Sequence, residues 1–414
     1  MSAARPLRIG MLLDAPFPPD PRVAQEARTL LDDGHAVHLF CLDWSGRPAR
    51  ETIDGLEIHR HPMSKTFHDK AGALALNLPL YRAWFRRRLR PFLRRLAIDV
   101  LHVHDLPLAR AGLAAAREQS LPLVLDLHEN FPAALRTYGY ARTLPGRLLI
   151  WPSAWERYER RMARRADRLI VVIEEAAQRL QELGIPPAKI AVVPNTVDHE
   201  RFRAFRRDAA VRARLDPQRY RVLYTGGFDE HRGLDTALAA VEAAARENRS
   251  LELVLVGAGR NRPRLEQEAR RRGLARHVRF EGWRPFETFP TYIEASQVGL
   301  IPHRKTAHTD TTIPHKLFHY MSLGLPVVVT DCAPLQRIVT ETGAGIVVPH
   351  SDPAAMAAAL DRLRHPELRR EMGDRGRRAV ETTYHWNRTA APLRALYHGL
   401  SVRDGPGAAE DAPR

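Results

Sequence analysis

Short apolar runs alternate along the chain with segments whose apolar residues recur at helical spacing. In the first half these runs cover residues 7–13, 36–41, 100–103, 123–127, 168–172 and 190–193. A second series covers residues 221–224, 252–256, 278–280, 298–301, 326–329 and 345–348. Strands that alternate with helices are typical of parallel sheets, because each parallel connection needs a crossover. The pattern predicts an α/β fold with two Rossmann-like halves.

The same pattern predicts the domain limits. Strand character is lost after Asn195 and returns after Asp216, so the halves meet near residues 200–216. We expect an N-terminal domain over 1–203, a C-terminal domain over 204–384 and a helix over 385–402 that crosses back to the N-terminal domain. The small, polar segment 403–414 is expected to be disordered. A first helix, from about Arg22 to Asp33, should end at Gly34.

Residues 81–96 combine apolar residues at helical spacing with arginines at most other positions. Such a helix can lie on an anionic membrane, its arginines near phosphates and its rings in the interface. It can equally be a surface helix that packs its apolar stripe on the domain core. Pro91 is expected to interrupt or kink it. Both readings stay open from the sequence.

The formal net charge is +16, from 64 basic and 48 acidic residues, and only five of the basic residues are lysines. Nucleic-acid binding motifs do not accompany this charge, so we expect phosphate-bearing substrates or an anionic membrane surface as partners, and no nucleic acid. Cys41 and Cys332 lie far apart, which gives neither a disulfide framework nor a metal cluster. With no long apolar run and no secretory signal, we expect a cytoplasmic protein.

Two glycine-bearing turns follow strands in the second half. Gly226 and Gly227 come directly after residues 221–224, and Gly257 and Gly259 come after residues 252–256. Glycines at such turns let backbone N–H groups approach an anion, and Arg232 adds a forked donor for phosphate oxygens. The alternative is that these glycines only form tight turns.

Residues 308–321 give a third signal. Thr311 or Thr312 can cap a helix whose first turn contains Pro314. The N–H groups of that first turn and the nearby Lys316 would then face a diphosphate. An ordinary capped helix with a solvated lysine is the alternative.

Several motifs together resemble retaining glycosyltransferase family 4, which has the GT-B fold. They are "FPPDPRV", "GHAVHLF", "HVHDLPLA", "LDLHEN" and "VVPNTVDHERF" in the first half, and "YTGGFDEHRGL", "LVLVGAG", "VRFEGW" and "IPHKLFHYMSLGLPVVVTD" in the second. The resemblance spans about residues 7–400. Each motif is loose, but their order and spacing are specific.

The resemblance implies a nucleotide-sugar site in the C-terminal domain, an acceptor site in the N-terminal domain and an active site in the cleft between them. It implies catalytic roles for His128, Arg232 and Lys316, with no metal and no cofactor besides a UDP- or GDP-sugar. The expected donor-binding residues are Gly226, Gly227, Gly257, Gly259, Asp310, Thr311, Thr312, Ile313, His315 and His319. The expected acceptor-side residues are Asp20, Arg22, Asp105 and Glu129.

The chain also departs from the family pattern. Gly227 stands where an arginine is common, and Thr311 and His319 stand where two glutamates are common. A change from carboxylate to imidazole removes a strong acceptor of hydroxyl groups. These changes leave open which sugar and nucleotide are used, and whether catalysis is retained.

The expected function is therefore transfer of a hexose-type sugar, with retention, to a hydroxyl of a lipid-linked or surface-glycan acceptor, as in polysaccharide biosynthesis. Peripheral contact with an anionic membrane would pass through residues 81–96. The alternatives are an inactive GT-B subunit that binds a nucleotide sugar or a partner transferase, and a nucleotide-sugar epimerase.

Overall fold

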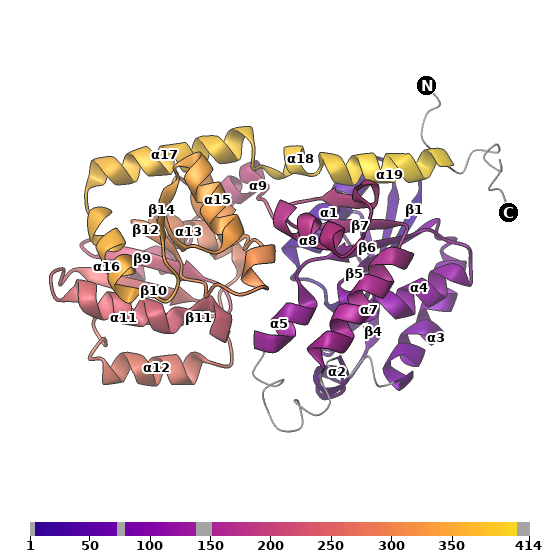
Figure 1. The fold of residues 1–414 in the computed structure, drawn as a ribbon, viewed down its shortest axis with the longest axis horizontal. Coiled ribbons are helices and arrows are strands. Elements are labelled where there is room, and N and C mark those ends of the chain that lie inside the picture. The colour runs from indigo at the N-terminus through magenta and orange to yellow at the C-terminus, as the bar shows by residue number, and fades with distance from the viewer. Residues whose placement is uncertain (1–4, 73–78, 138–150, 404–414) are drawn as a thin grey trace. The chain divides into compact units, whose positions relative to one another are not determined.

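The computed structural model describes residues 5–72, 79–137 and 151–403. Residue contacts divide the chain into two compact units. Unit 1 takes the described residues of Met1–Pro132, Thr143–Pro194 and Ala390–Arg414, and unit 2 takes those of Ala133–Arg142 and Asn195–Thr389. Each unit has its own sheet (Figure 1). Residues 404–414, most of the predicted tail, lie outside the described residues.

Unit 1 contains an eight-stranded sheet in the described residues, in the order β3–β4–β2–β1–β5–β6–β7–β8. All neighbouring strands are parallel except the β3–β4 pair. In sheet order the strands are β3 (Arg50–Ile53), β4 (Leu56–Pro62), β2 (Ala36–Asp43), β1 (Arg8–Pro16), β5 (Val100–His104), β6 (Leu123–Leu127), β7 (Arg168–Val171) and β8 (Ile190–Val192).

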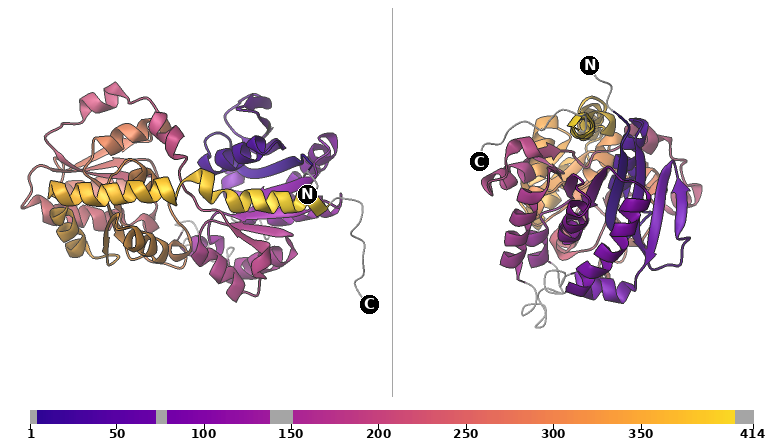
Figure 2. Two further views of the ribbon diagram at one scale, coloured as in Figure 1. Left: turned by 90° about the horizontal axis from the view of Figure 1, so that it is seen from above. Right: turned by 90° about the vertical axis from the view of Figure 1, so that its right-hand side faces the viewer.

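The helices of unit 1 flank this sheet, as the end-on view in Figure 2 shows. They are α1 (Pro21–Asp32), α2 (Lys65–Gly72), α3 (Pro79–Arg95), α4 (Ala109–Arg117), α7 (Pro152–Arg165), α8 (Glu174–Glu182) and α19 (Ala391–Arg403). Helix α5 (Phe131–Thr137) contains the boundary between the units. Helix α19 contacts both α1 and β8, so the end of the chain packs into unit 1.

Unit 2 contains a six-stranded parallel sheet in the described residues, in the order β11–β10–β9–β12–β13–β14. Its strands are β11 (Val278–Gly282), β10 (Leu251–Val256), β9 (Tyr220–Thr225), β12 (Val298–Ile301), β13 (Val327–Thr330) and β14 (Gly345–Val348). Its helices are α9 (His199–Ala204), α10 (Ala209–Arg214), α11 (Leu234–Ala245), α12 (Arg262–Arg271), α13 (Phe289–Glu294), α14 (Lys316–Ser322), α15 (Ala333–Thr342), α16 (Pro353–Arg362), α17 (Pro366–Thr382) and α18 (Trp386–Thr389).

The central strands are buried and mostly apolar because helices cover both faces of each sheet, and the few polar residues in them, such as Glu252 of β10, are paired. Every residue of β10 is buried, and so is every residue of β13. In unit 2 the buried faces of β9 and β10 pack with α11 and α16 into one core. All twelve strands that the apolar runs predict are present, which confirms the two Rossmann-like α/β halves.

A hairpin of two strands, β3 and β4, was missed by the apolar pattern. Three of the four residues of β3 are exposed, so that strand carries no apolar run. Its turn did carry a signal, since Asp54-Gly55 is a favoured pair for a two-residue hairpin turn. Both residues have positive φ, of 49° and 84°.

Helix α3 packs the apolar stripe of residues 81–96 on the domain core. Its apolar residues Tyr81, Phe85, Leu89, Phe92 and Leu93 are buried in unit 1. These side chains are therefore unavailable to a membrane interface, whereas Trp84 of the same helix is half-buried, with the Arg88 guanidinium 4.0 Å from its ring. The helix also continues through Pro91, against the predicted interruption. Arginines of its outer face remain exposed.

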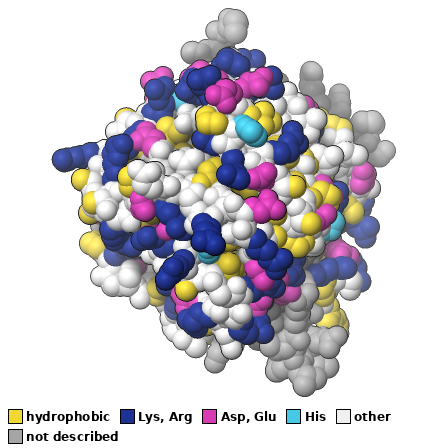
Figure 3. Space-filling model, turned by 90° about the vertical axis from the view of Figure 1, so that its left-hand side faces the viewer, with side chains coloured by type: hydrophobic (Ala, Val, Ile, Leu, Met, Phe, Trp, Pro, Cys, Tyr) yellow, Lys and Arg dark blue, Asp and Glu magenta, His cyan; other side chains and the backbone are white. Residues whose placement is uncertain are grey.

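Charges on the surface are mixed in sign. On the face of the molecule that Figure 3 turns to the viewer, basic side chains are interspersed with acidic ones. In unit 2, Arg272 contacts both Glu242 and Glu268, and Arg262 contacts Glu266. The excess of arginine is thus partly balanced locally. Among the described helices, none has the length and apolar character needed to cross a bilayer.

Candidate active site

In unit 1 the candidate site residues lie on β5 and β6 and just beyond the ends of these strands. His102 and His104 belong to β5, and Asp105 follows it directly. Asp126 belongs to β6, and His128 comes two residues later. These strands are parallel neighbours, so their carboxyl ends meet at one edge of the sheet, where ligands of open α/β sheets commonly bind.

Arg22 joins this edge from α1. Asp20 caps that helix by accepting a hydrogen bond from the Val23 N–H, and Pro21 occupies the first turn. Arg22 donates two hydrogen bonds to Asp126, Nε to Oδ2 at 3.1 Å and Nη2 to Oδ1 at 2.9 Å. A third goes from Nη1 to the Val193 carbonyl at 2.9 Å. Its guanidinium is thus used within the protein, and its side chain is 3% exposed.

Asp126 is fully buried, and burial alone would raise its pKa. The charges of Arg22 and His128 outweigh burial and hold the pKa of Asp126 well below its ordinary value. Its carboxylate therefore stays ionised. This is a buried ion pair with near-ideal bidentate geometry.

His128 lies between two carboxylates. Its Nε2 is 2.6 Å from Asp126 Oδ2, and its Nδ1 is 3.5 Å from Asp105 Oδ2. Burial lowers the pKa of His128, but the two carboxylates outweigh that effect and raise it to about 10. At neutral pH the ring is an imidazolium, a hydrogen-bond donor at both nitrogens. Its side chain is 17% exposed, so the ring is not sealed in the core.

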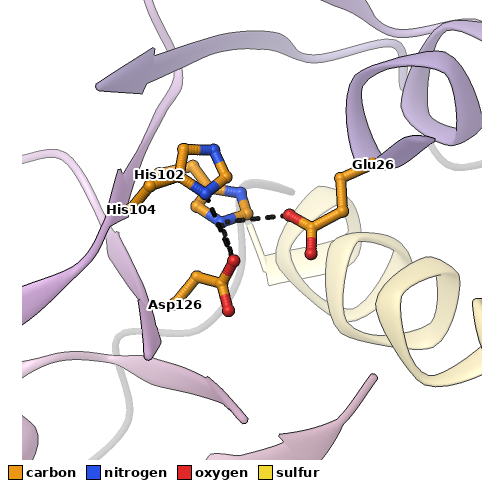
Figure 4. Close-up of side chains that lie close together, drawn as sticks. All are labelled: Glu26, His102, His104 and Asp126. Atoms are coloured by element: carbon orange, nitrogen blue, oxygen red, sulfur yellow. Dashed lines mark hydrogen bonds and ion pairs between the residues drawn. The ribbon is translucent and has the colours of Figure 1, made fainter. Parts of the chain in front are cut away.

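Behind His128 lie Glu26, His102 and His104, which Figure 4 shows around Asp126. The four side chains each offer a ligand atom within 4.8 Å of the others, a spacing that a metal site also has. However, Arg22 contacts both carboxylates, Asp126 as above and Glu26 Oε1 at 2.8 Å. A guanidinium thus already occupies the position beside both carboxyl groups.

Burial also shifts the pKa values of Glu26 and His104 in this cluster. Burial raises the pKa of Glu26 to about 8 and lowers that of His104 to about 3. The Tyr397 hydroxyl of α19 is 2.8 Å from Nδ1 of His102. The C-terminal helix therefore contacts this network directly through one phenol.

The remaining acceptor-side residues lie on the same sheet edge. Asp105 has its side chain 36% exposed, and Glu129 follows His128 and is half-buried. Asp20 is committed to capping α1 through its Oδ1. Unit 1 thus brings together Arg22, Asp105 and His128, and adds Asp126, which the sequence analysis did not single out.

In unit 2 the two glycine-bearing turns lie against each other. Gly226 donates to the Val256 carbonyl and Phe228 to the Ala258 carbonyl. Gly226 and Gly257 have φ of 132° and 147°, a region that favours glycine. A Cβ on Gly257 would lie 1.9 Å from the Gly226 oxygen, so this glycine is required by packing. Gly259 is similarly close to Phe228, with its Cβ position 2.7 Å from the backbone nitrogen.

Gly226 has a different neighbour, the amine of Lys316. A Cβ at Gly226 would lie 2.8 Å from Lys316 Nζ. That amine is also 3.7 Å from the centroid of the Tyr224 ring, and Tyr224 donates a 2.5 Å hydrogen bond to the Gly227 carbonyl. Glycine 226 therefore leaves space beside the amine, and Tyr224 fixes the loop around it.

Lys316 is 7% exposed, and its Nζ has no hydrogen-bond partner among the residues that the structure describes. Burial lowers its pKa well below the ordinary lysine value, and Arg232 lowers it further, while Asp229 opposes them. An amine in such surroundings gains stability from any anion that reaches it.

Arg232 is the second cation of this region. It ends the short 3₁₀ turn Glu230–Arg232, and its Nη1 donates to Nε2 of His303 at 3.2 Å. Its Nε is buried without a partner. Burial and the nearby cations lower the pKa of His303 well below its ordinary value, so the ring accepts as a neutral imidazole. His231 also has both ring nitrogens buried without a partner.

The segment before Lys316 differs from the prediction. Helix α14 begins at Lys316, its N-cap is His315, and no side chain caps it. Thr311 instead ends the 3₁₀ turn Thr309–Thr311 and donates to the Ala307 carbonyl, while Thr312 is extended. The expected threonine cap is therefore wrong. Since the helix starts later and has seven residues, the N–H groups of residues 311–313 are not its N-terminus.

Other residues of this segment that the sequence predicts to bind the nucleotide sugar have partners within the chain itself. Asp310 Oδ1 accepts from the Ala333 N–H at the start of α15, at 2.8 Å. Ile313 is buried, and its carbonyl accepts from Nδ2 of Asn195. His319 stacks on Phe202 at 4.8 Å, with His315 stacked at 6.1 Å. Burial lowers the pKa of His319 well below its ordinary value.

Sequence reasoning missed Asp126, His303 and Tyr224, which partner the predicted residues His128, Arg232 and Lys316. Asp126 had a weak signal, because a carboxylate inside an otherwise apolar buried strand needs a partner. Tyr224 and His303 had none, since their roles come from contacts between distant parts of unit 2.

Comparison with known proteins agrees with this architecture. The model of Glycosyltransferase Family 4 matches residues 22–201, and that of Glycosyl transferases group 1 matches residues 219–365. A D-inositol 3-phosphate glycosyltransferase of Thermomonospora curvata is 28% identical over 335 residues, covering 76% of this chain and 75% of that protein.

Solved structures share the fold. The sucrose-phosphate synthase of Thermosynechococcus elongatus superimposes with a TM-score of 0.79 at 20% identity, covering 96% of this chain and 100% of that one. The HepE protein of Anabaena in complex with UDP gives 0.68 at 14% identity, with 96% and 100% coverage. The two family matches together span most of the chain, which therefore belongs to glycosyltransferase family 4, with the GT-B fold, and transfers sugar from a nucleotide sugar.

Proposed function

We propose that this enzyme transfers a hexose-type sugar, with retention, from a UDP- or GDP-sugar to a hydroxyl group, and that Lys316 and Arg232 bind the donor diphosphate. One observation carries the proposal. The Lys316 amine is buried beside Arg232 without a hydrogen-bond partner, against a loop kept open by Gly226. Burial of an unpaired amine is costly, and a diphosphate would supply the missing charge.

The proposed chemistry is departure of the nucleoside diphosphate. Negative charge grows on the leaving oxygen, and cations fixed beforehand stabilise it without reorganisation. The acceptor hydroxyl attacks from the face that the diphosphate leaves, and the phosphate takes its proton. Lys316 and Arg232 thus fill the role that a metal ion fills elsewhere. His128 enters as a cation and donates a hydrogen bond, rather than acting as a base.

The wider donor site is proposed around these cations. Gly226 and Gly227 bring the loop backbone to the phosphates, while Gly257 and Gly259 support that loop from the next strand. Thr311, Thr312, His315 and His319 remain candidates for the sugar and nucleoside. Asp310 and Ile313 act by holding their segment in place. In unit 1, Arg22 and Asp20 position the residues that face the acceptor, Asp105 and Glu129.

For the acceptor we propose a phosphate-bearing molecule such as a lipid-linked glycan. Helix α3 presents a groove of about 650 Å³ lined by Ala83, Arg86, Arg87, Arg90, Pro91, Arg94 and Arg95. Arg86 and Arg90 both form an ion pair with the Glu118 carboxylate. Among the described residues, these are the ion pairs found for the arginines of this groove. A similar protein acts on D-inositol 3-phosphate, also a phosphate ester. Contact with anionic lipid would be electrostatic, and so lost at high salt.

Nucleotide release tests the donor site. Wild type, Arg232→Ala and Lys316→Ala are each incubated with UDP-, GDP- and dTDP-sugars, and free nucleotide is measured. Lys305→Ala is the control, because Lys305 is an exposed lysine of unit 2 that donates to the Asp331 carbonyl. We expect each site variant to lose about 10²–10³-fold of turnover with the active donor. Near-normal turnover in both site variants contradicts the assignment, and donor binding without any release favours an inactive subunit.

A liposome assay tests the acceptor surface. The protein is mixed with phosphatidylserine-containing and phosphatidylcholine-only vesicles at low and high salt. We expect binding only to the anionic vesicles and only at low salt. Replacing Arg87, Arg94 and Arg95 with glutamine should abolish it. Absence of binding at low salt removes the support for a membrane-linked acceptor.

A further inference from the structure

Two histidines and a glutamate lie together on the sheet of unit 1. His38 of β2 and Glu57 of β4 are partners across these two parallel strands, and His59 comes two residues after Glu57. Because side chains of a strand alternate between its two faces, Glu57 and His59 lie on the same face. Each of the three residues offers a ligand atom within 4.8 Å of the others. The sequence analysis singled out none of them.

The Glu57 carboxylate lies beside both rings. Its Oε2 is 3.0 Å from Nδ1 of His38 and 3.9 Å from Nε2 of His59. The second separation is too long for a hydrogen bond. Nε2 of His59 is buried and has no hydrogen-bond partner among the described residues. A buried polar atom of this kind needs an explanation, and a ligand held together with the carboxylate would supply one.

The exposure of the three side chains suits a metal ion that enters from solvent. The side chains of His38 and His59 are 10% and 12% exposed, whereas that of Glu57 is 53% exposed. The ring of His59 packs edge-on against Phe92 of α3, with the centroids 5.3 Å apart. The two rings are thus held by the fold, while the exposed carboxylate can turn. Water can reach the side that the carboxylate covers.

The buried cluster around Asp126 makes a useful contrast. It also has the spacing of a metal site, but Arg22 contacts both of its carboxyl groups. The ion pairs found for Glu57 in the described part of the chain are those with His38 and His59. No guanidinium therefore takes the place of a metal ion beside this carboxylate in the described residues.

One neighbouring charge opposes a metal ion. Arg50 of β3 is the strand partner of His59 and is exposed. Burial lowers the pKa of His59, the charges of His38 and Arg50 lower it further, and Glu57 opposes them. The ring of His59 is therefore neutral at pH 7, which is the form that binds metals. Because Arg50 is exposed, water and salt screen its repulsion.

We propose that His38, Glu57 and His59 bind a Zn²⁺ ion through Nδ1 of His38, a carboxylate oxygen of Glu57 and Nε2 of His59, with water as the fourth ligand. Imidazole and carboxylate are ordinary zinc ligands, and ligand atoms of a tetrahedral site lie about 3.3 Å apart. The separations of 3.0 Å and 3.9 Å bracket this value, so a small turn of the exposed carboxylate brings the ligands into place.

The position of the three residues indicates a structural ion. His38 is the third residue of β2, and Glu57 and His59 are the second and fourth residues of β4. The candidate active site lies instead at the carboxyl ends of the strands. The ion would therefore connect β2 to β4 and stabilise unit 1 without taking part in sugar transfer. This inference does not depend on the proposed function.

Zinc titration of the full chain tests the site. The protein is treated with EDTA, desalted and titrated with ZnCl₂ in a calorimeter, and a second sample receives Co²⁺ as a spectroscopic substitute. We expect one tightly bound Zn²⁺ per chain and the visible absorption bands of a tetrahedral Co²⁺ complex. Zinc at roughly 100 times its Kd should raise the melting temperature by about 5 °C. Absence of zinc binding overturns the proposal.

Substitutions locate the ion. His38→Gln, His59→Gln and Glu57→Gln should each weaken zinc binding by about 10-fold or more, since even the outer partners of a metal site are worth about 10- to 100-fold. Glu57→Gln is the safest of the three for folding, because Glu57 is exposed. His350→Gln is the matched control. His350 is exposed and its Nδ1 is 2.9 Å from the Asp331 carboxylate, but it belongs to no such group of three among the described residues.

The control should bind zinc like wild type. Zinc binding that survives in all three site variants overturns the proposal, and so does an equal loss in His350→Gln.

Arg50→Gln gives a result that a damaged fold cannot imitate. Removal of this charge from the neighbouring strand should tighten zinc binding about 2- to 5-fold at low salt, and the gain should shrink as salt is added. Unchanged or weaker binding in Arg50→Gln would place the ion elsewhere and overturn the site.

Discussion

The two units bury their charges differently. In unit 1 the buried carboxylate of Asp126 lies between two cations, the guanidinium of Arg22 and the ring of His128, at distances of 2.6–3.1 Å. In unit 2 the Lys316 amine is equally buried, and among the described residues the charged groups that act on it are Arg232, which repels it, and the carboxylate of Asp229. The first arrangement is complete before a substrate arrives. The second gains its counter-charge from the ligand, so substitutions in the two units should have opposite effects on stability.

The largest effect is expected for Asp126→Asn. This substitution removes the bidentate carboxylate from the buried Arg22 guanidinium, which keeps its contact with Glu26, and breaking a buried pair typically costs about 3–5 kcal/mol of unfolding free energy. Urea denaturation measures the loss. Asp54→Asn is the control, because Asp54 also pairs with an arginine, Arg28, but is exposed, and it should lose less than about 1 kcal/mol. Equal losses in the two variants would show that burial of the pair has no consequence.

Lys316→Met should show the opposite sign in stability. The thioether fills the space without an unpartnered polar group, so the unfolding free energy of the free protein should rise by about 1 kcal/mol. Turnover should nevertheless fall about 10²–10³-fold, because a cation at the leaving group is lost.

Lys189→Met serves as its matched control. The Lys189 amine donates to the carbonyls of Arg164 and Ala166, at 3.1 and 3.0 Å. Removal of these bonds should cost about 1 kcal/mol and leave turnover unchanged. A stability loss in Lys316→Met as large as that in the control would mean that Lys316 already has a partner.

When the nucleotide diphosphate binds, the protein should take up protons. In the free protein, burial and Arg232 lower the pKa of Lys316, and a bound diphosphate would raise it again. Affinity for UDP or GDP should therefore fall as pH rises from the lowered pKa of Lys316 in the free protein towards the ordinary lysine value. His231 and His303 face the same region and can add to the uptake, since the pKa of each is lowered in the free protein. Calorimetry in two buffers of different ionisation enthalpy measures the number of protons, and zero uptake in wild type contradicts the assignment.

The smallest effect concerns His128 in unit 1. Its folded pKa, about 10, lies above the ordinary value of 6.5, so its charge stabilises the fold fully below about pH 6.5 and the contribution is lost as pH rises through 10. The NMR signals of its ring should show an imidazolium at pH 8. In Asp105→Asn the pKa should fall but stay above 6.5, because Asp126 still holds the ring. A neutral ring at pH 7 in wild type would contradict the proposed role of His128 as a cation that donates a hydrogen bond.

Much of the fold follows from the sequence because a buried parallel strand must be apolar along its length. The runs 252–256 and 326–329 identify their strands for this reason, although the first contains Glu252, which pairs with Arg221. Strand β3 is exposed and has no such run, so it needed its turn residues to reveal it. Helix α3 illustrates a second limit: the same apolar stripe suits a membrane and a core, and only the packing of Phe85 and Leu89 decides between them.

The candidate residues were easier to find than their surroundings. Lys316 and Arg232 lie next to glycine turns and a helix, features that short motifs carry. His128 contacts Asp126 of β6 and Asp105, which follows β5. Asp126 is held by Arg22 of α1, 104 residues earlier in the chain, and no local pattern records that contact. The start of α14 was misjudged because threonine is a good cap in general, whereas here Thr311 is used in a 3₁₀ turn.

The charge difference between the units is tested most directly by the melting temperature with and without nucleotide. Wild type, Lys316→Met and Asp126→Asn are each measured alone and with UDP and GDP, because a ligand that binds only the folded state raises this temperature. We predict that Lys316→Met melts higher than wild type when free but gains little from either nucleotide, whereas Asp126→Asn melts lower and keeps the nucleotide-dependent rise. A Lys316→Met protein that melts lower than wild type and is stabilised by nucleotide as strongly as wild type would contradict the diphosphate site.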